Sequence, residues 1–197
     1  MKSVHKSVLL QEVVDGLYIG LQGGETKWYL DGTLGGAGHA LAMAKAFKGN
    51  VNILGLDADS KAIERANVTL QGQCKRLILE TRSYRYLDEV LDKNEVQNID
   101  LMLLDLGLSS DELENSGKGF TFQKDEPLLM TFGDKDYYFN AHDVVNSWKE
   151  EDLSNVIFAY GEERYARRIA RSIVRYREKK KVETSGELAE LVKMSVP

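Results

Sequence analysis

The feature that most constrains this chain is a strand, loop, helix and strand pattern in its first third. A short apolar stretch ends at Asp31, a glycine-dense loop follows at residues 32–38, and an alanine-rich helical pattern runs to residue 47. A second apolar stretch over residues 51–56 is followed directly by Asp57. This order is typical of a parallel α/β unit, in which glycines let the backbone turn tightly and approach a ligand.

The residues around this loop favour one kind of ligand. Asp57, at the tip of the second predicted strand, can accept hydrogen bonds from the hydroxyls of a ribose. Asp31, directly before the glycines, would repel a pyrophosphate and suits a cationic or amino-bearing ligand. Leu41 stands where the dinucleotide fingerprint needs a small residue, so NAD fits the pattern poorly. S-adenosylmethionine offers a ribose, an amino group and a sulfonium. A glycine-rich turn without a ligand is the alternative.

Two more apolar runs, at residues 76–80 and 99–105, predict a third and a fourth strand. Helical patterns lie between the runs, and Asp59 is a plausible N-cap for the helix that extends to Leu70. Strands that alternate with helices in this way indicate a doubly wound parallel α/β sheet with right-handed crossovers.

The end of the fourth run predicts the reaction centre. Asp105 stands there, so three acids occupy the carboxyl ends of strands, where ligands of open α/β sheets bind. A carboxylate at this place could accept a hydrogen bond from an amine that is being alkylated. Ser109 and Ser110 follow, and they either orient a base or cap the turn.

Beyond this run the pattern changes. Residues 109–139 are polar and irregular and are typical of a long functional loop, and only helical signals follow. Ser147 with Glu150, and Thr184 with Glu187, have the spacing of capping boxes. Gly161 separates two of the later helices. We therefore predict two domains, a nucleoside-binding domain over residues 1–114 and a loop with a helical segment over residues 115–197.

Charge is distributed unevenly along the chain. The formal net charge is −5, yet residues 164–197 hold ten Lys/Arg against four Asp/Glu. A helix is predicted from residue 164 onward, and one of its faces carries Tyr165, Ile169, Ile173 and Tyr176. The opposite face carries Arg164, Arg168, Arg171 and Arg175. Such a face could contact the phosphates of a nucleic acid, and a solvated helix face without a partner is the alternative.

The remaining composition excludes several classes of protein. With a single cysteine, Cys74, the chain forms no internal disulfide, and its three scattered histidines have no metal-ligand spacing, so we expect no metal. No run resembles a signal peptide or reaches the length of a membrane span, so we expect a cytoplasmic protein without membrane contact.

The motifs together resemble one family, the ribosomal RNA small subunit methyltransferase H family. The matching stretches are residues 5–14 (HKSVLLQEVV), 31–39 (DGTLGGAGH), 55–59 (GLDAD), 104–110 (LDLGLSS), 119–122 (GFTF) and 160–164 (YGEER). The resemblance covers nearly the whole chain. It implies a class I, Rossmann-like methyltransferase fold and S-adenosylmethionine-dependent methylation of the N4 amine of a cytidine in 16S ribosomal RNA of the small subunit.

The resemblance and the loop pattern together predict roles for individual residues. Cofactor-binding residues would be Asp31, Gly35, Gly36, Ala37, Gly38, His39, Asp57, Tyr84, Asp105 and Glu112, with Ala37, Gly38 and His39 at the methionine end and Tyr84 at the adenine. Catalytic residues would be Asp105, Ser109 and Ser110. RNA-binding residues would be Lys118, Arg164, Arg168, Arg171 and Arg175, because the segment from about residue 115 matches the family's helical substrate-recognition insert.

The chain departs from the family pattern at several places. The family usually has glycine at the position of Ala37, a change that is tolerated if φ is negative there. Glu112 replaces a glutamine, Lys118 replaces an arginine, and Leu129 and Thr131 replace an acid and a base. These losses leave open a second function, that of a non-catalytic remnant that binds RNA or cofactor. An NAD-dependent dehydrogenase is a third, for which no nicotinamide site is evident.

The family also continues beyond the point that corresponds to Pro197, into the last strands of the sheet. We therefore expect an incomplete sheet with an open edge. Either the chain is a piece of a longer protein, or a partner covers that edge, and a homodimer is one such arrangement.

Overall fold

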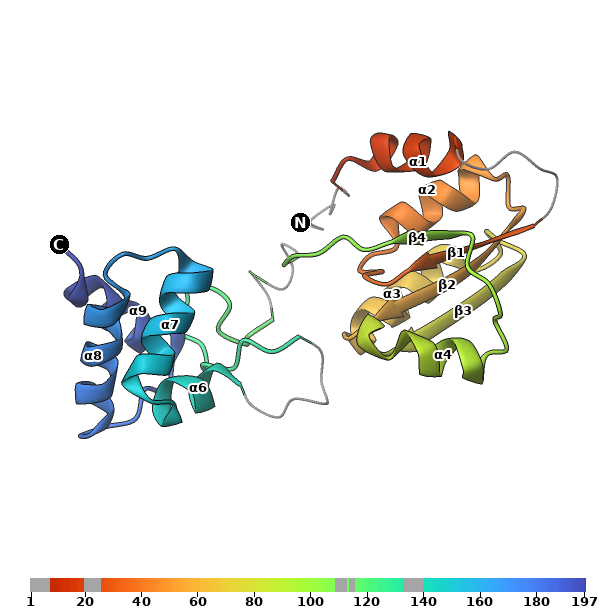
Figure 1. Cartoon of the computed structure of the whole chain (residues 1–197). Coiled ribbons are helices and arrows are strands. Elements are labelled where there is room, and N and C mark those ends of the chain that lie inside the picture. Colours follow the sequence, from red (N-terminus) through yellow and green to blue (C-terminus); the bar gives the residue numbers. More distant parts are fainter. Residues whose placement is uncertain (1–7, 20–25, 109–112, 114–115, 133–139) are drawn as a thin grey trace. The chain divides into compact units, whose positions relative to one another are not determined.

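The computed structural model describes residues 8–19, 26–108, 113, 116–132 and 140–197 (Figure 1). The chain divides into two compact units. Residues 1–107 and 132–135 form the first, here called the sheet unit, and residues 108–131 and 136–197 form the second, the helical unit. The predicted boundary lies at residues 114–115, whereas the observed division falls after Gly107. Among the described residues, no helix combines the length and the apolar character that a bilayer span needs.

In the described residues of the sheet unit, four parallel strands follow the order β3-β2-β1-β4. The strands are β1 (Lys27–Asp31), β2 (Val51–Asp57), β3 (Arg76–Thr81) and β4 (Leu101–Leu103). The predicted α/β class with a parallel sheet is thus confirmed. β4 is shorter than the apolar run over residues 99–105. Side chains replace backbone partners on both sides of it: the Asp100 carboxylate accepts a hydrogen bond from the N–H of Trp28 (2.7 Å), and the N–H of Asp105 donates to the hydroxyl of Thr33 (2.7 Å). Within the described residues, β4 forms one edge of the sheet.

Helices cover both faces of this sheet. The elements are α1 (Leu10–Ile19), α2 (Gly38–Ala46), α3 (Ser60–Leu70), a 3₁₀ turn η1 (Tyr84–Tyr86) and α4 (Leu87–Lys93). One core cluster joins α2 and α3 to Tyr29 and Ile53 of the sheet, and a second joins α4 to Leu30 and Leu54. Adjacent strand residues therefore point into opposite cores, as the side-chain alternation of a strand requires. Figure 1 shows α2 and α4 on opposite sides of the sheet.

The helical unit is built from α6 (Ala141–Ser147), α7 (Glu150–Gly161), α8 (Ala166–Arg177) and α9 (Ser185–Ser195). Its core contains Leu128, Val145, Leu153, Ile169, Ala170, Ile173, Val182 and Leu191. The two-faced pattern predicted for the basic helix is confirmed for Ile169 and Ile173, which are buried, and for Arg168, Arg171 and Arg175, which are exposed. The helix was predicted from residue 164 onward, but α8 begins at Ala166, so Arg164 and Tyr165 precede it. α7 ends at Gly161, as predicted.

One predicted capping box is wrong. Ser147 is the last residue of α6, and its hydroxyl donates a hydrogen bond to the carbonyl of Asp143 in the preceding turn. α7 has Lys149 at its N-cap and no side-chain cap. The box lies instead at the start of α6, where Asn140 and Asp143 each accept a hydrogen bond from the other's backbone N–H.

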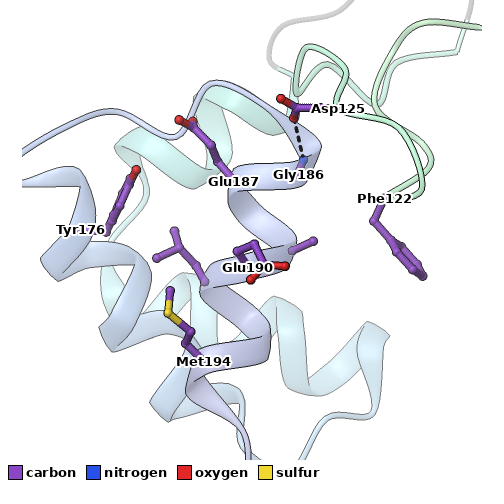
Figure 2. A pocket seen from close by; sticks show the side chains of 9 residues that line it. Phe122, Asp125, Tyr176, Gly186, Glu187, Glu190 and Met194 are labelled. Atoms are coloured by element: carbon purple, nitrogen blue, oxygen red, sulfur yellow. Dashed lines mark hydrogen bonds between the residues drawn. The ribbon is translucent and has the colours of Figure 1, made fainter.

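The described part of the long loop, residues 116–132, is held by the start of α9. Pro127 and Thr184 form an antiparallel bridge, and the Asp125 carboxylate accepts a hydrogen bond from the N–H of Gly186 (3.1 Å). Figure 2 shows this bond beside a cavity of about 390 Å³, which residues of α8 and α9 also line. Gly119 has a φ of +78°, and a Cβ there would lie 2.5 Å from the carbonyl oxygen of Pro127, so only glycine fits.

Thr184 caps α9, as predicted, by accepting a hydrogen bond from the N–H of Glu187 (3.2 Å). The reciprocal half of the box differs from the expected one. The Glu187 carboxylate accepts from the N–H of Glu183 (2.8 Å), one residue before the cap. The start of α9 is therefore tied to its own first turn and to the loop at residues 124–128.

Candidate functional site

Three acids meet at the carboxyl edge of the parallel sheet. Asp31 ends β1 and Asp57 ends β2, while Asp105 lies just beyond β4. The register pairs Asp31 with Gly55 on one side and with Leu103 on the other, so β1 is central to this edge. The structure thus brings together the acids that the sequence pattern selected. This edge is where open α/β sheets bind their ligands.

Asp57 shapes the glycine loop between β1 and α2. One carboxylate oxygen accepts a hydrogen bond from the N–H of Gly35 (2.7 Å), and the other accepts from the N–H of Asp59 (2.9 Å). Gly35 itself has a φ of +51°. A Cβ added at Gly36 would meet nothing within 4 Å, so the loop has open space above it. A ligand can therefore approach the backbone of the loop closely.

Ala37, the residue before α2, was expected to be tolerated only if its φ were negative, and this condition is not met. Its φ is +63° and its ψ is 24°, which is the left-handed region. This conformation costs an L-residue roughly 1–2 kcal/mol. The Ala37 methyl group is fully buried in the core cluster with Tyr29 and Met43, and that burial offsets part of the cost.

Asp31 is the most unusual of the three acids, because its side chain is buried, with 1% of the residue exposed. Its two oxygens accept hydrogen bonds from the N–H of Thr33 and the hydroxyl of Tyr29, each at 3.2 Å. Burial raises the pKa of the Asp31 carboxyl to about 6, and the hydrogen bonds and nearby His39 hold it below the value that burial alone would give. The site therefore keeps a carboxylate in a place that disfavours its charge.

His39 and Asp105 face each other across the same edge. His39 is largely buried at the start of α2, and its Nδ1 lies 4.0 Å from a carboxylate oxygen of Asp105. Its Nε2 lies 3.0 Å from the carbonyl oxygen of Val8 and must donate to it, because a carbonyl only accepts. This bond fixes the ring so that Nδ1 faces Asp105, whose own side chain is 48% exposed.

Tyr84 and Thr33 complete the edge. Tyr84, in η1, is 42% exposed and packs beside Gly32, where a Cβ would lie 3.2 Å from the Tyr84 Cβ and 2.5 Å from a methyl carbon of Leu104. Thr33 links the ends of β1 and β4, because its hydroxyl accepts from the N–H of Asp105 (2.7 Å). Neither Thr33 nor Tyr29 was predicted to be a site residue, since Thr33 falls inside the loop motif and Tyr29 inside an apolar run.

The predicted RNA-binding residues belong to the helical unit. Arg168, Arg171 and Arg175 are exposed on α8, and the Arg164 guanidinium, just before α8, lies 4.7 Å from the centre of the Tyr165 ring. Arg171 also lies 3.5 Å from a carboxylate oxygen of Glu150. Lys118 is on the loop at residues 116–132. Ser109, Ser110 and Glu112 lie outside the described residues.

One arginine of this region has a structural task instead. Arg177, at the end of α8, donates hydrogen bonds to the carbonyls of Val145 (2.6 Å) and Trp148 at the end of α6. The guanidinium thus binds two carbonyls at the end of a helix, where backbone acceptors extend beyond the helical hydrogen bonds. The basic stretch therefore divides into an exposed face and one residue that joins two helices.

The comparison with known families decides what kind of chain this is. The model of the MraW methylase family matches residues 2–197. The chain belongs to the MraW methylase family.

Two curated relatives of this MraW methylase family member carry the name ribosomal RNA small subunit methyltransferase H. The protein of Paenibacillus sp. (strain JDR-2) is 41% identical over 199 residues, which is 98% of this chain and 61% of the relative. The protein of Lachnospira eligens is 40% identical over 197 residues, which is 100% of this chain and 61% of the relative. The chain thus spans about three fifths of the length of these relatives.

A solved structure from Clostridium thermocellum, provisionally described as an rRNA-methylase, also aligns with the chain. The alignment covers 44% of this chain and 46% of the other, with 22% identity and a TM-score of 0.35. A likeness of that size supports no conclusion about site or function.

The raised pKa of Asp31 predicts an effect on stability. The folded state holds this proton more tightly than the unfolded chain, so the stabilising contribution is full below about pH 3.8 and is lost as pH rises through about 6. In Asp31→Asn the side chain stays neutral. As the pH rises from 4 to 8, we expect the free energy of unfolding of the wild type to fall by about 2–3 kcal/mol relative to that of the variant.

Urea unfolding, followed by Trp28 fluorescence in a Trp148→Phe background, measures this difference in the sheet unit. Asp92→Asn, an exposed acid on α4, is the matched control and should show no such change. A difference between Asp31→Asn and wild type that is the same at both pH values would contradict the assignment.

Proposed function

We propose that this chain binds S-adenosylmethionine and supplies the cofactor site and the RNA-recognition helices of an enzyme that methylates the N4 amine of a cytidine in 16S ribosomal RNA. Family membership and the names of the two relatives support the methyltransferase class. The observation that carries the cofactor is Asp31. A buried carboxylate beside an open glycine loop suits a ligand with a positive charge.

The residues of the sheet unit fit this cofactor in distinct ways. Asp57 would accept hydrogen bonds from the ribose hydroxyls, because its carboxylate is already fixed by two backbone N–H groups. Asp31, with Gly35 and Gly36, would receive the cationic methionine end. The other cofactor contacts that we propose are Ala37, Gly38 and His39 at the methionine end, Tyr84 at the adenine, and Glu112 at the rim.

Positioning is the main task left to the protein in this reaction. The methyl group of S-adenosylmethionine is already activated by the sulfonium, so no strong base is required. Asp105 would accept a hydrogen bond from the amine of the cytosine and keep the nitrogen lone pair in line with the methyl group. Ser109 and Ser110 would orient the base, which must leave its stack to reach the site.

The helical unit would hold the RNA, on the small ribosomal subunit in the cytoplasm. Arg168, Arg171 and Arg175 form one exposed stripe along α8, because residues spaced by three and four lie on one helix face. Arg164 precedes the helix and is a further exposed arginine. Guanidinium groups bind phosphates in a bidentate manner, so this stripe would follow an RNA backbone, with Lys118 as a further contact.

Calorimetric titration with S-adenosylmethionine tests the cofactor site. We expect micromolar binding by the wild-type chain and a loss of about 10–100-fold in Asp57→Ala, because hydrogen bonds to a charged group contribute about 1.5–3 kcal/mol. Asp92→Ala is the matched control and should bind like wild type. A chain that is folded by circular dichroism and binds no S-adenosylmethionine would contradict the proposal.

The arginine stripe predicts a specific salt dependence. Replacing Arg168, Arg171 and Arg175 together by glutamine should weaken binding to a small-subunit RNA fragment. The slope of log K against log salt concentration should become shallower by about 2, because each phosphate contact on single-stranded RNA contributes about 0.7. Lys61→Gln, on the exposed face of α3, serves as control. If the slope of the triple variant equals that of wild type, the stripe does not contact phosphates.

A further inference from the structure

The hydroxyl of Tyr29 is buried directly beneath the proposed cofactor site. Tyr29 lies two residues before Asp31 on β1, so both side chains point to the same face of the sheet. The residue is fully buried, and its ring packs in the apolar cluster with Met43 and Ile53. Its hydroxyl donates to Asp31 Oδ2 at 3.2 Å. Burial raises the pKa of Tyr29 far above its usual range, so the hydroxyl keeps its proton at every physiological pH.

We propose that Tyr29 is a positioning residue for cofactor binding, whose hydroxyl holds the Asp31 carboxylate in the orientation that receives the cationic end of S-adenosylmethionine. The inference rests on the proposed function of the site. Tyr29 and the N–H of Thr33 each donate to a different oxygen of Asp31. Two donors fix the plane of a carboxylate before any ligand arrives, and such preorganisation lowers the ordering cost of binding.

The chemistry of the core supports a role for the hydroxyl beyond packing. A phenylalanine would fill the same space on β1 without the desolvation that a buried hydroxyl brings. The Tyr29 hydroxyl has Asp31 as its hydrogen-bond acceptor, so its contribution is directed at that carboxylate. The Tyr29 ring packs in the apolar core, while its hydroxyl oxygen donates a hydrogen bond to a residue of the proposed site.

Several charged groups surround Asp31 and set its charge together. His39 faces it from α2 and favours the ionised carboxylate, while Asp57 at the end of β2 disfavours it. Asp105, beyond β4, lies next to His39. The hydrogen bond from Tyr29 favours the ionised form. Without that bond the pKa of Asp31 rises above about 6, so less of the carboxylate is charged near neutral pH.

Tyr29→Phe tests the proposal by calorimetry with two ligands between pH 5.5 and pH 8. If the midpoint for Asp31 moves up by about one pH unit, the lost charge alone weakens S-adenosylmethionine binding by the variant about threefold at pH 6.5 and hardly at all at pH 8. A loss of affinity that remains at pH 8 then measures the lost orientation of the carboxylate. Methylthioadenosine shares the adenosine but lacks the charged amino-acid end. It should bind both proteins equally at every pH.

A double variant and a control separate positioning from simple damage to the core. In an Asp31→Asn background, Tyr29→Phe should leave S-adenosylmethionine affinity nearly unchanged, because the partner carboxylate is gone. Tyr18→Phe, whose ring packs against Phe47, should behave like wild type. A Tyr29→Phe variant that binds both ligands more weakly by the same factor at all pH values would overturn the inference, since its role would then be structural.

Two further results distinguish the inference from the function on which it rests. A wild-type chain that binds S-adenosylmethionine, together with a Tyr29→Phe variant whose affinity and pH profile are unchanged, overturns the inference alone. A folded wild-type chain that binds neither ligand overturns the cofactor assignment and the inference with it.

Discussion

The proposed cofactor site of the sheet unit depends on the carboxyl end of β1. This central strand ends in Asp31, whose carboxylate is buried. Asp31 pairs through its backbone with the strands on both sides, while its side chain is closed in by Tyr29 and Thr33. An acid in such a place lowers the stability of the free protein above about pH 6. A charge that disfavours folding is expected where a ligand of opposite charge is to be bound.

Charged side chains act differently in the two units. The sheet unit gathers three carboxylates at one edge, and one of them, that of Asp31, is buried, where a charge has a stronger effect than in water. The helical unit exposes arginines to solvent, where a single ion pair contributes little to stability. A row of exposed cations can instead bind the phosphates of a polyanion such as RNA. Arg177 marks the boundary between these uses within one helix, because its guanidinium caps α6 and leaves the exposed stripe to the others.

The sequence could predict what depends on local pattern. The strand ends at Asp31 and Asp57 and the buried isoleucines of α8 follow from periodicity and turn chemistry. Details that tertiary contacts decide could not be predicted. The left-handed conformation of Ala37 depends on how the loop closes onto Asp57, and the false capping box at Ser147 arose because that spacing also occurs at helix ends. The hydrogen bond from Tyr29 to Asp31 could not be predicted, because it joins two side chains two residues apart on the same strand face and no motif marks it.

A carbon-13 NMR titration of the Asp31 carboxyl group tests the central claim most directly. In the free protein the carboxyl should titrate near pH 6, and saturating S-adenosylmethionine should lower that pKa, because a bound positive charge stabilises the carboxylate. The wild-type protein is required, with Asp31→Asn to assign the resonance. An Asp31 carboxyl that titrates near the ordinary aspartate value, or that S-adenosylmethionine leaves unchanged, would contradict the account.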